Sequence, residues 1–180
     1  MNYTSIVKRI DNLGRIVLPK EIRRKLKLRE NDEVEIILND ESSVILKKYS
    51  AITEYEKECV ILANILDELV ENNNVLITDN FSVFVCGKKE YEYLVDRKLS
   101  KKFLNILQDR KIFTEKISPT FDILDMEEGI YAKIIVPIIV DSAVSGSVVI
   151  FSRDKNTTVR DKDIDLVKFA SLLLSSKIKI

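Results

Sequence analysis

The 180-residue chain contains no histidine and only two cysteines. Without histidine it can form neither a Ser-His-Asp nor a Cys-His catalytic arrangement, and no metal site with histidine ligands. Cys59 and Cys86 stand alone in the sequence, without the paired spacing of metal-binding or redox motifs. We therefore expect two reduced, buried thiols that pack as small hydrophobes, and no metal site.

Carboxylates are the remaining candidates for catalysis, and their arrangement argues against an enzyme. Most of them lie in loop-like segments and lack matched spacing: Asp79, Asp122, Asp125, Glu127 and Glu128. No nucleotide-binding motif accompanies them. The sequence thus predicts no catalytic residue and no cofactor, and we do not expect an enzyme.

Long hydrophobic runs are also absent. No apolar stretch approaches the roughly 20 residues that cross a bilayer, and residues 1–12 lack the apolar region of a signal peptide. Hydrophobic residues make up 46% of the chain and charged residues 32%, a balance typical of globular proteins. We expect a cytoplasmic protein with no membrane partner, built as one medium domain or two small ones.

The neutral net charge conceals a steep gradient near the N-terminus. Residues 1–29 hold nine basic and two acidic residues, whereas residues 30–46 hold six acidic residues and no basic one. Such local asymmetry indicates a polyanionic partner.

The first fifty residues read as two strands, a short helix and two more strands. The strand segments are rich in β-branched residues or alternate in polarity and span residues 4–11, 14–18, 32–40 and 42–49. Between them, "PKEIRRKLKL" (residues 19–28) reads as a helix, with Pro19 suited to its first position. A unit of this size buries a poor core, so we expect it to be a dimer, with strands that interleave.

The short helix carries a stripe of positive charge opposite its apolar side. At about 100° per residue, Ile22 and Leu26 face the strands. The basic residues of the opposite stripe are Lys20, Arg23, Arg24 and Lys27. Such a stripe is either an ordinary solvated face or a binding surface. The binding reading gains weight from basic residues on the neighbouring strands, Lys8, Arg9 and Arg15.

Residues 4–50 resemble the AbrB-like swapped-hairpin DNA-binding domain. The resemblance is carried by "IVKRIDNLGRIVLPKEIRRKLKLRENDEVEII" and "VILKKYS", and its core "LGRIVLPKEIRR" is specific. It implies a β-barrel formed by two interdigitated chains that bind double-stranded DNA. The family's DNA-contacting positions fall on Lys8, Arg15, Arg23 and Arg24. Position 8 is usually arginine, and lysine lacks the planar fork that reads guanine. The full predicted DNA-binding set is Lys8, Arg9, Arg15, Lys20, Arg23, Arg24 and Lys27.

After a linker at residues 51–56, residues 57–180 read as a second domain. A helix begins near Glu54 and repeats apolar residues at heptad-like spacing: Tyr55, Cys59, Leu62, Leu66 and Leu69. This seam could pair with another helix, or the helix could pack on its own sheet through Ile61 and Ile65. Strands follow at "NVLITD" and "FSVFVCG", then an amphipathic helix in "DRKLSKKFLNILQDR", and two strands around a turn at residues 142–146. Thr158 and Asp161 are spaced as a capping box for the last helix.

This order resembles a GAF domain, an α/β sensor fold with a central antiparallel sheet, so the chain is predicted to be α+β. "VPIIVDSAVSGSVVIFSRD" resembles the closing hairpin of that fold. The resemblance implies either a small-molecule ligand, which the sequence does not identify, or a closed pocket in a purely structural dimerisation domain. Together the two resemblances imply a sporulation transcription regulator, activator or repressor, that acts in the forespore and forms tetramers through the GAF helices.

The predicted partner is A·T-rich, bendable DNA, because few of the basic residues are suited to reading base edges. The alternative is an antitoxin-like interaction protein, since AbrB-like domains also occur in toxin–antitoxin pairs. Such antitoxins usually carry a disordered tail that wraps the toxin. Here the second half has regular apolar periodicity and reads as folded, which argues against that alternative.

Overall fold

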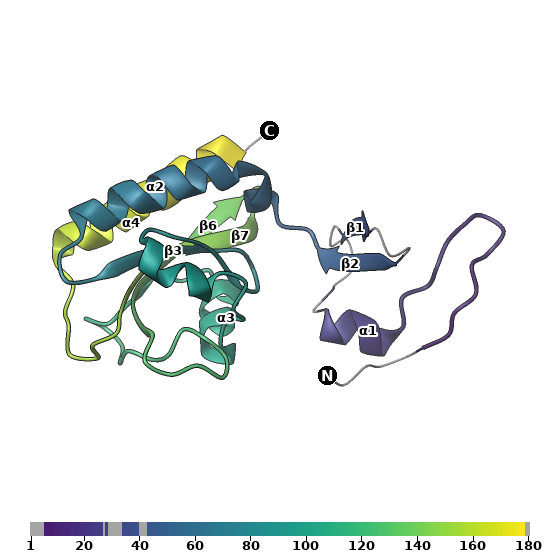
Figure 1. Cartoon of the computed structure of the whole chain (residues 1–180), viewed down its shortest axis with the longest axis horizontal. Coiled ribbons are helices and arrows are strands. Elements are labelled where there is room, and N and C mark those ends of the chain that lie inside the picture. The colour runs from purple at the N-terminus through teal and green to yellow at the C-terminus, as the bar shows by residue number, and fades with distance from the viewer. Residues whose placement is uncertain (1–5, 27, 29–33, 40–42, 179–180) are drawn as a thin grey trace. The chain divides into compact units, whose positions relative to one another are not determined.

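The computed structural model describes residues 6–26, 28, 34–39 and 43–178. The chain divides into two compact units, which we call the N-terminal unit (residues 1–49) and the C-terminal unit (residues 50–180). Figure 1 shows the elements of each unit along the chain.

The described residues of the N-terminal unit form one short helix and one hairpin. Helix α1 spans Lys20–Lys25, and strands β1 (Val34–Leu38) and β2 (Val44–Lys48) pair antiparallel, with Ile36 opposite Leu46. At the end of β1 the side chain of Asn39 accepts hydrogen bonds from the backbone N–H of Ser43 at 3.1 Å and from its hydroxyl at 2.7 Å. This closes the hairpin, because a short amide side chain can substitute for a backbone acceptor in a turn.

The two strands predicted at residues 4–11 and 14–18 are not strands in the described part of the single chain. Residues 6–18 form an extended segment folded back at a turn, and all their apolar side chains except the half-buried Leu18 are exposed. Val7 is 90% exposed and Val17 is 76% exposed. A β-branched run becomes a strand only when another strand satisfies its backbone groups, and among the described residues these runs pair with no strand.

The C-terminal unit is built on a five-stranded antiparallel sheet with strand order β4-β3-β7-β6-β5. Its strands are β3 (Asn74–Thr78), β4 (Val83–Cys86), β5 (Phe113–Thr114), β6 (Tyr131–Val140) and β7 (Ala143–Ser152). The β6–β7 turn falls at Asp141–Ser142, both with positive φ, and not at residues 142–146 as predicted. The long hairpin therefore begins pairing at Ala143, and Gly146 lies within the strand.

Both faces of the sheet are covered, which explains its nearly continuous apolar strands. Helices α2 (Glu56–Leu69) and α4 (Asp161–Ile178) lie side by side on one face (Figure 1). Helix α3 (Lys101–Gln108) and the loops around it cover the other face, where Phe103 and Phe151 are fully buried. Two short 3-10 segments, η1 (Ala51–Tyr55) and η2 (Lys89–Leu94), complete the unit. The prediction of an α+β chain with a central antiparallel sheet in its second half is confirmed.

Helix α2 turns part of its predicted seam, Cys59 and Leu66, toward its own sheet, whereas Leu69 at the end of the seam is exposed. Cys59 is fully buried and Leu66 is 3% exposed, whereas Ile61 and Ile65 are 59% and 50% exposed. Of the two alternatives, packing on the sheet through Ile61 and Ile65 is therefore wrong. Both sides of this helix are apolar, so periodicity alone does not show which side faces the sheet.

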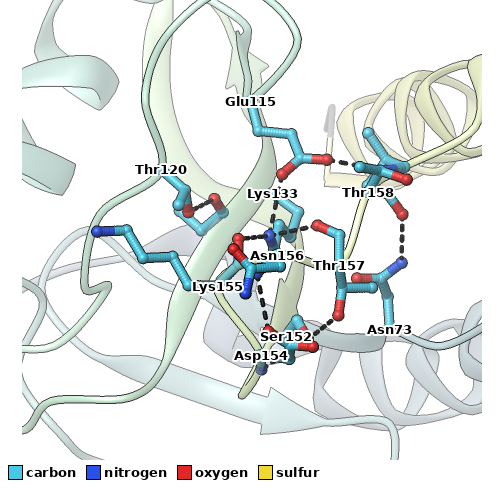
Figure 2. Close-up of polar contacts among 12 residues, drawn as sticks. Asn73, Glu115, Thr120, Lys133, Ser152, Asp154, Lys155, Asn156, Thr157 and Thr158 are labelled. Carbon is cyan, nitrogen blue, oxygen red and sulfur yellow. Dashed lines mark hydrogen bonds and ion pairs between the residues drawn. The ribbon is translucent and has the colours of Figure 1, made fainter.

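A buried lysine connects the sheet to the segment that precedes α4 (Figure 2). Lys133 of β6 is completely buried, and its ammonium donates to Glu115 Oε2 at 2.9 Å, to the carbonyl of Lys155 at 2.8 Å and to the carbonyl of Thr157. Glu115 Oε1 accepts the backbone N–H of Val159 at 2.9 Å. All three ammonium protons thus have acceptors, the condition under which a buried lysine is tolerated.

The predicted capping box of Thr158 and Asp161 does not form. Helix α4 begins at Asp161, and its cap is made by Asp163, whose Oδ2 accepts the backbone N–H of Arg160 at 2.9 Å. The Arg160 guanidinium donates to the same carboxylate at 2.7 Å and to the carbonyl of Leu69 at 3.0 Å. The Arg160–Asp163 pair therefore caps the N-terminus of α4, and Arg160 also connects it to the last residue of α2.

Candidate nucleic-acid interface

All but one of the predicted DNA-binding residues lie within the described part of the chain, and those are exposed. They are Lys8, Arg9, Arg15, Lys20, Arg23 and Arg24. Lys27 lies outside the described residues. The exposed cations occupy one segment of about twenty residues, on the turn and on helix α1. A local field of this sign attracts phosphate groups.

The turn between the two apolar runs is held by Asp11. Its Oδ1 accepts the backbone N–H of Leu13 at 2.9 Å and that of Arg15 at 2.8 Å, and its Oδ2 accepts Nε of Arg15 at 2.8 Å. Gly14 has φ of +76°, a conformation that strains residues with a Cβ. Hydrogen bonds from the backbone and then the side chain of Arg15 hold the pKa of Asp11 below its usual 3.8.

Helix α1 follows from Pro19, which is its N-cap residue (φ −58°, ψ 151°) and not its first helical residue as predicted. The carbonyl of Pro19 accepts the N–H of Arg23 at 2.9 Å. Glu21 stands in the first turn, and Arg23, Arg24 and Lys25 stand in the last, the distribution that the helix dipole favours. Ile22 is half-buried, so the helix rests on its apolar side and presents its basic side to solvent.

The N-terminal unit also exposes many apolar side chains. Leu13 is 68% exposed, Ile10 65% and Ile16 56%, and on the hairpin Leu38 is 77% and Ile36 68% exposed. Single exposed apolar side chains are normal, but here five such side chains fall within the described residues of one small unit.

The described residues contain no group of three or more histidine, cysteine or acidic side chains arranged to hold a metal ion. None of the helices in the described part of the chain is long and apolar enough to span a membrane. On the face of the sheet that α3 covers, the buried side chains include Phe103, Phe113 and Ile135. A shallow depression lies at the surface, lined by Asp96, Arg97, Lys98, Asp125, Met126 and Glu127.

Burial raises the pKa of both thiols to about 12, with smaller contributions from nearby carboxylates. Cys59 is buried and Cys86 is half-buried, and neither forms a disulfide.

Sequence reasoning missed Asp11 as a partner of Arg15. The signal was present in the spacing "DNLGR", because an aspartate three residues before a glycine is typical of a turn that the aspartate side chain closes.

The two units of the chain match two different protein families. Residues 7–54 match the family model "Antidote-toxin recognition MazE, bacterial antitoxin". Residues 54–179 match the model "Stage V sporulation protein T C-terminal, transcription factor". The C-terminal fold is also similar to a crystal structure of a methyl-accepting chemotaxis protein, residues 122 to 287, with a TM-score of 0.51 and 17% identity over 71% of this chain and 94% of that one. That likeness concerns the fold alone.

Two curated relatives come from Bacillus subtilis (strain 168). The transition state regulatory protein AbrB is 51% identical over 49 residues, which are 27% of this chain and 50% of AbrB. Stage V sporulation protein T is 33% identical over 156 residues, which are 86% of this chain and 87% of that protein. The basic AbrB-like unit and the transcription-factor unit define a DNA-binding transcriptional regulator. The chain belongs to the stage V sporulation protein T family, which consists of transcription factors and not of enzymes.

Proposed function

We propose that two copies of the chain interleave their N-terminal units into one barrel, which binds A·T-rich, bendable DNA and regulates sporulation genes in the forespore. One observation carries the proposal: residues 6–24 combine exposed cations with exposed apolar side chains. A partner chain would cover the apolar runs and pair their backbone as strands. The cations at the turn and on α1 would remain at the surface, doubled by the two-fold symmetry of the dimer.

The charge of this dimer sets its dependence on salt. The residues that match the family's DNA-contacting positions are Lys8, Arg15, Arg23 and Arg24, which makes eight cations per dimer. If all eight neutralise phosphates, the logarithm of the binding constant falls against that of salt with a slope of about −7. Contacts to base edges would make the slope shallower, because they release no counterions.

Sequence preference is tested by competition. Fluorescence anisotropy of a labelled A·T-rich duplex is measured with unlabelled A·T-rich or G·C-rich duplexes as competitors. The proposal expects the A·T-rich competitor to displace the label at several-fold lower concentration. Equal displacement by both duplexes would remove the A·T preference and leave a purely electrostatic DNA binder.

We also propose that two such dimers join through the outer faces of α2 and α4. These faces expose apolar side chains at helical spacing: Ile61, Ile65, Leu69, Phe169 and Leu172. Helices that share an exposed apolar stripe pack by burying it against a second copy. Sedimentation velocity of an Ile65→Glu/Leu172→Glu variant tests this, with Lys101→Glu on α3 as the charge-changing control. A tetramer that becomes a dimer only in the first variant is expected.

Ligand gating is the remaining part of the proposal. Such a ligand would bind beneath α3, next to the buried side chains of that face, and it gates DNA binding only by favouring one arrangement of the dimers. A thermal-shift screen of nucleosides, amino acids and small anions on the full chain tests for such a ligand. A compound that raises the melting temperature should also shift the DNA titration; without one, the C-terminal unit acts as a scaffold. The antitoxin-like alternative is weakened by the ordered sheet and helices of residues 50–178.

A further inference from the structure

Asp11 stands where a DNA-binding surface should avoid negative charge. Residues 1–29 contain only two acids, Asp11 and Glu21. Asp11 lies between Arg9 and Arg15, two of the proposed DNA-contacting residues. A carboxylate there repels phosphates, so its presence calls for a compensating role.

The contacts of Asp11 divide between its two oxygens. Oδ1 accepts two backbone N–H groups, those of Leu13 and Arg15, and so holds the turn. Oδ2 accepts Nε of Arg15 at 2.8 Å and so holds the guanidinium. The backbone also closes the turn, with the N–H of Asp11 donating to the carbonyl of Arg15 at 3.1 Å. One carboxylate therefore fixes both the backbone and the side-chain direction of Arg15.

An arginine held through Nε still has the edge formed by Nη1 and Nη2. That edge matches the two oxygens of a phosphate or the O6 and N7 atoms of guanine. A free arginine side chain loses considerable conformational entropy when it is ordered on binding, and prior fixation removes that cost from the binding step.

We propose that Asp11 is a positioning residue for DNA recognition, which orients the Arg15 guanidinium before DNA arrives. The inference rests on the proposed function, because it assigns Arg15 to the DNA interface. It predicts the opposite change in DNA affinity from the one that charge alone predicts. Charge alone says that removing a carboxylate from this surface strengthens DNA binding. Positioning says that removing this carboxylate weakens it.

The experiment compares full-length Asp11→Asn with full-length Glu21→Gln on the same A·T-rich duplex. Asparagine keeps an Oδ1 that can accept the two backbone N–H groups, but this places its amide N–H₂ opposite Arg15 Nε, so that two donors face each other. Glu21→Gln removes the same charge from the same basic segment. Arg15→Ala and the double variant Asp11→Asn/Arg15→Ala complete a double-mutant cycle. Circular dichroism melts show that each variant is folded.

We expect Asp11→Asn to weaken binding roughly fivefold, since an exposed pair contributes little singly but acts twice in a dimer. Glu21→Gln should bind DNA equally or more tightly. In the Arg15→Ala background, Asp11→Asn should no longer weaken binding. Tighter binding by Asp11→Asn would overturn the inference, and so would equal weakening in the presence and absence of Arg15. A wild-type chain that does not bind DNA would refute the proposed function itself.

Discussion

Replacing the buried Lys133 by methionine should destabilise the C-terminal unit severely. Methionine fills most of the same volume but leaves three acceptors without their donor: Glu115 Oε2 and the carbonyls of Lys155 and Thr157. The Lys133 side chain is 0% exposed and that of Glu115 11% exposed, so water has little access to the space between them. Removing one partner of a buried ion pair costs about 3–5 kcal/mol, because the other charge remains buried and unpaired.

The matched variant is Lys133→Met/Glu115→Gln. It also removes the unpaired negative charge of Glu115, while glutamine Oε1 can still accept a hydrogen bond from the N–H of Val159. We expect it to recover part of the loss, with a coupling free energy of about 1–3 kcal/mol. Lys116→Met is the control, since Lys116 pairs with Asp161 at 2.7 Å on the surface. An exposed pair of this kind contributes at most about 1 kcal/mol.

Urea unfolding of the full chain, followed by far-UV circular dichroism at fixed protein concentration, measures these differences. The reasoning is refuted if Lys133→Met lowers the free energy of unfolding by no more than Lys116→Met does. It is refuted equally if the effects of the Lys133 and Glu115 substitutions simply add, because the two groups would then act independently.

Three further predictions concern the C-terminal unit. Burial raises the pKa of Asp163, but the hydrogen bonds and charge of Arg160 outweigh burial and hold it below the usual 3.8. The unfolded chain therefore binds the proton more readily, so this stabilisation is present above about pH 4 and is lost as pH falls through the folded pKa. Asp163→Asn should flatten acid unfolding curves in that range. With thiol pKa values of about 12, Cys59 and Cys86 should resist iodoacetamide at pH 8 until urea unfolds the chain, as mass spectrometry would show. Gly146→Ala should cost about 1–3 kcal/mol in the same urea assay, because its Cβ would lie 2.1 Å from the carbonyl oxygen of Thr78.

Local patterns in the sequence predicted the elements whose causes are local. The hairpin β6–β7 and helix α3 followed from β-branched runs and an amphipathic stretch, and Ser100 caps α3 by accepting the N–H of Phe103 at 3.3 Å. The strands expected at residues 4–11 and 14–18 are not formed in the part of the chain that the structure describes. Their β-branched residues favour pairing with another strand, but they do not indicate which segment or which chain supplies that strand.

The remaining differences come from contacts between residues far apart in sequence. Lys133 reads as an ordinary polar residue in a strand, and its partners lie 18 to 24 residues away. Thr158 was expected to cap α4, but its carbonyl instead accepts the side-chain N–H of Asn73 at 3.2 Å (Figure 2). The Asp11–Arg15 pair is local, four residues apart, and was within reach of sequence reasoning.

The most direct test of the DNA-binding assignment is the salt dependence of binding with and without the basic side of α1. Anisotropy of a labelled A·T-rich duplex is measured across a salt series for the full chain, for Arg23→Ala/Arg24→Ala and for a fragment of residues 52–180. The account predicts a wild-type slope near −7, a slope shallower by about 3–4 units in the double variant, which removes four cations per dimer, and no binding by the fragment. Equal slopes for wild type and double variant, or binding by the fragment alone, would contradict it.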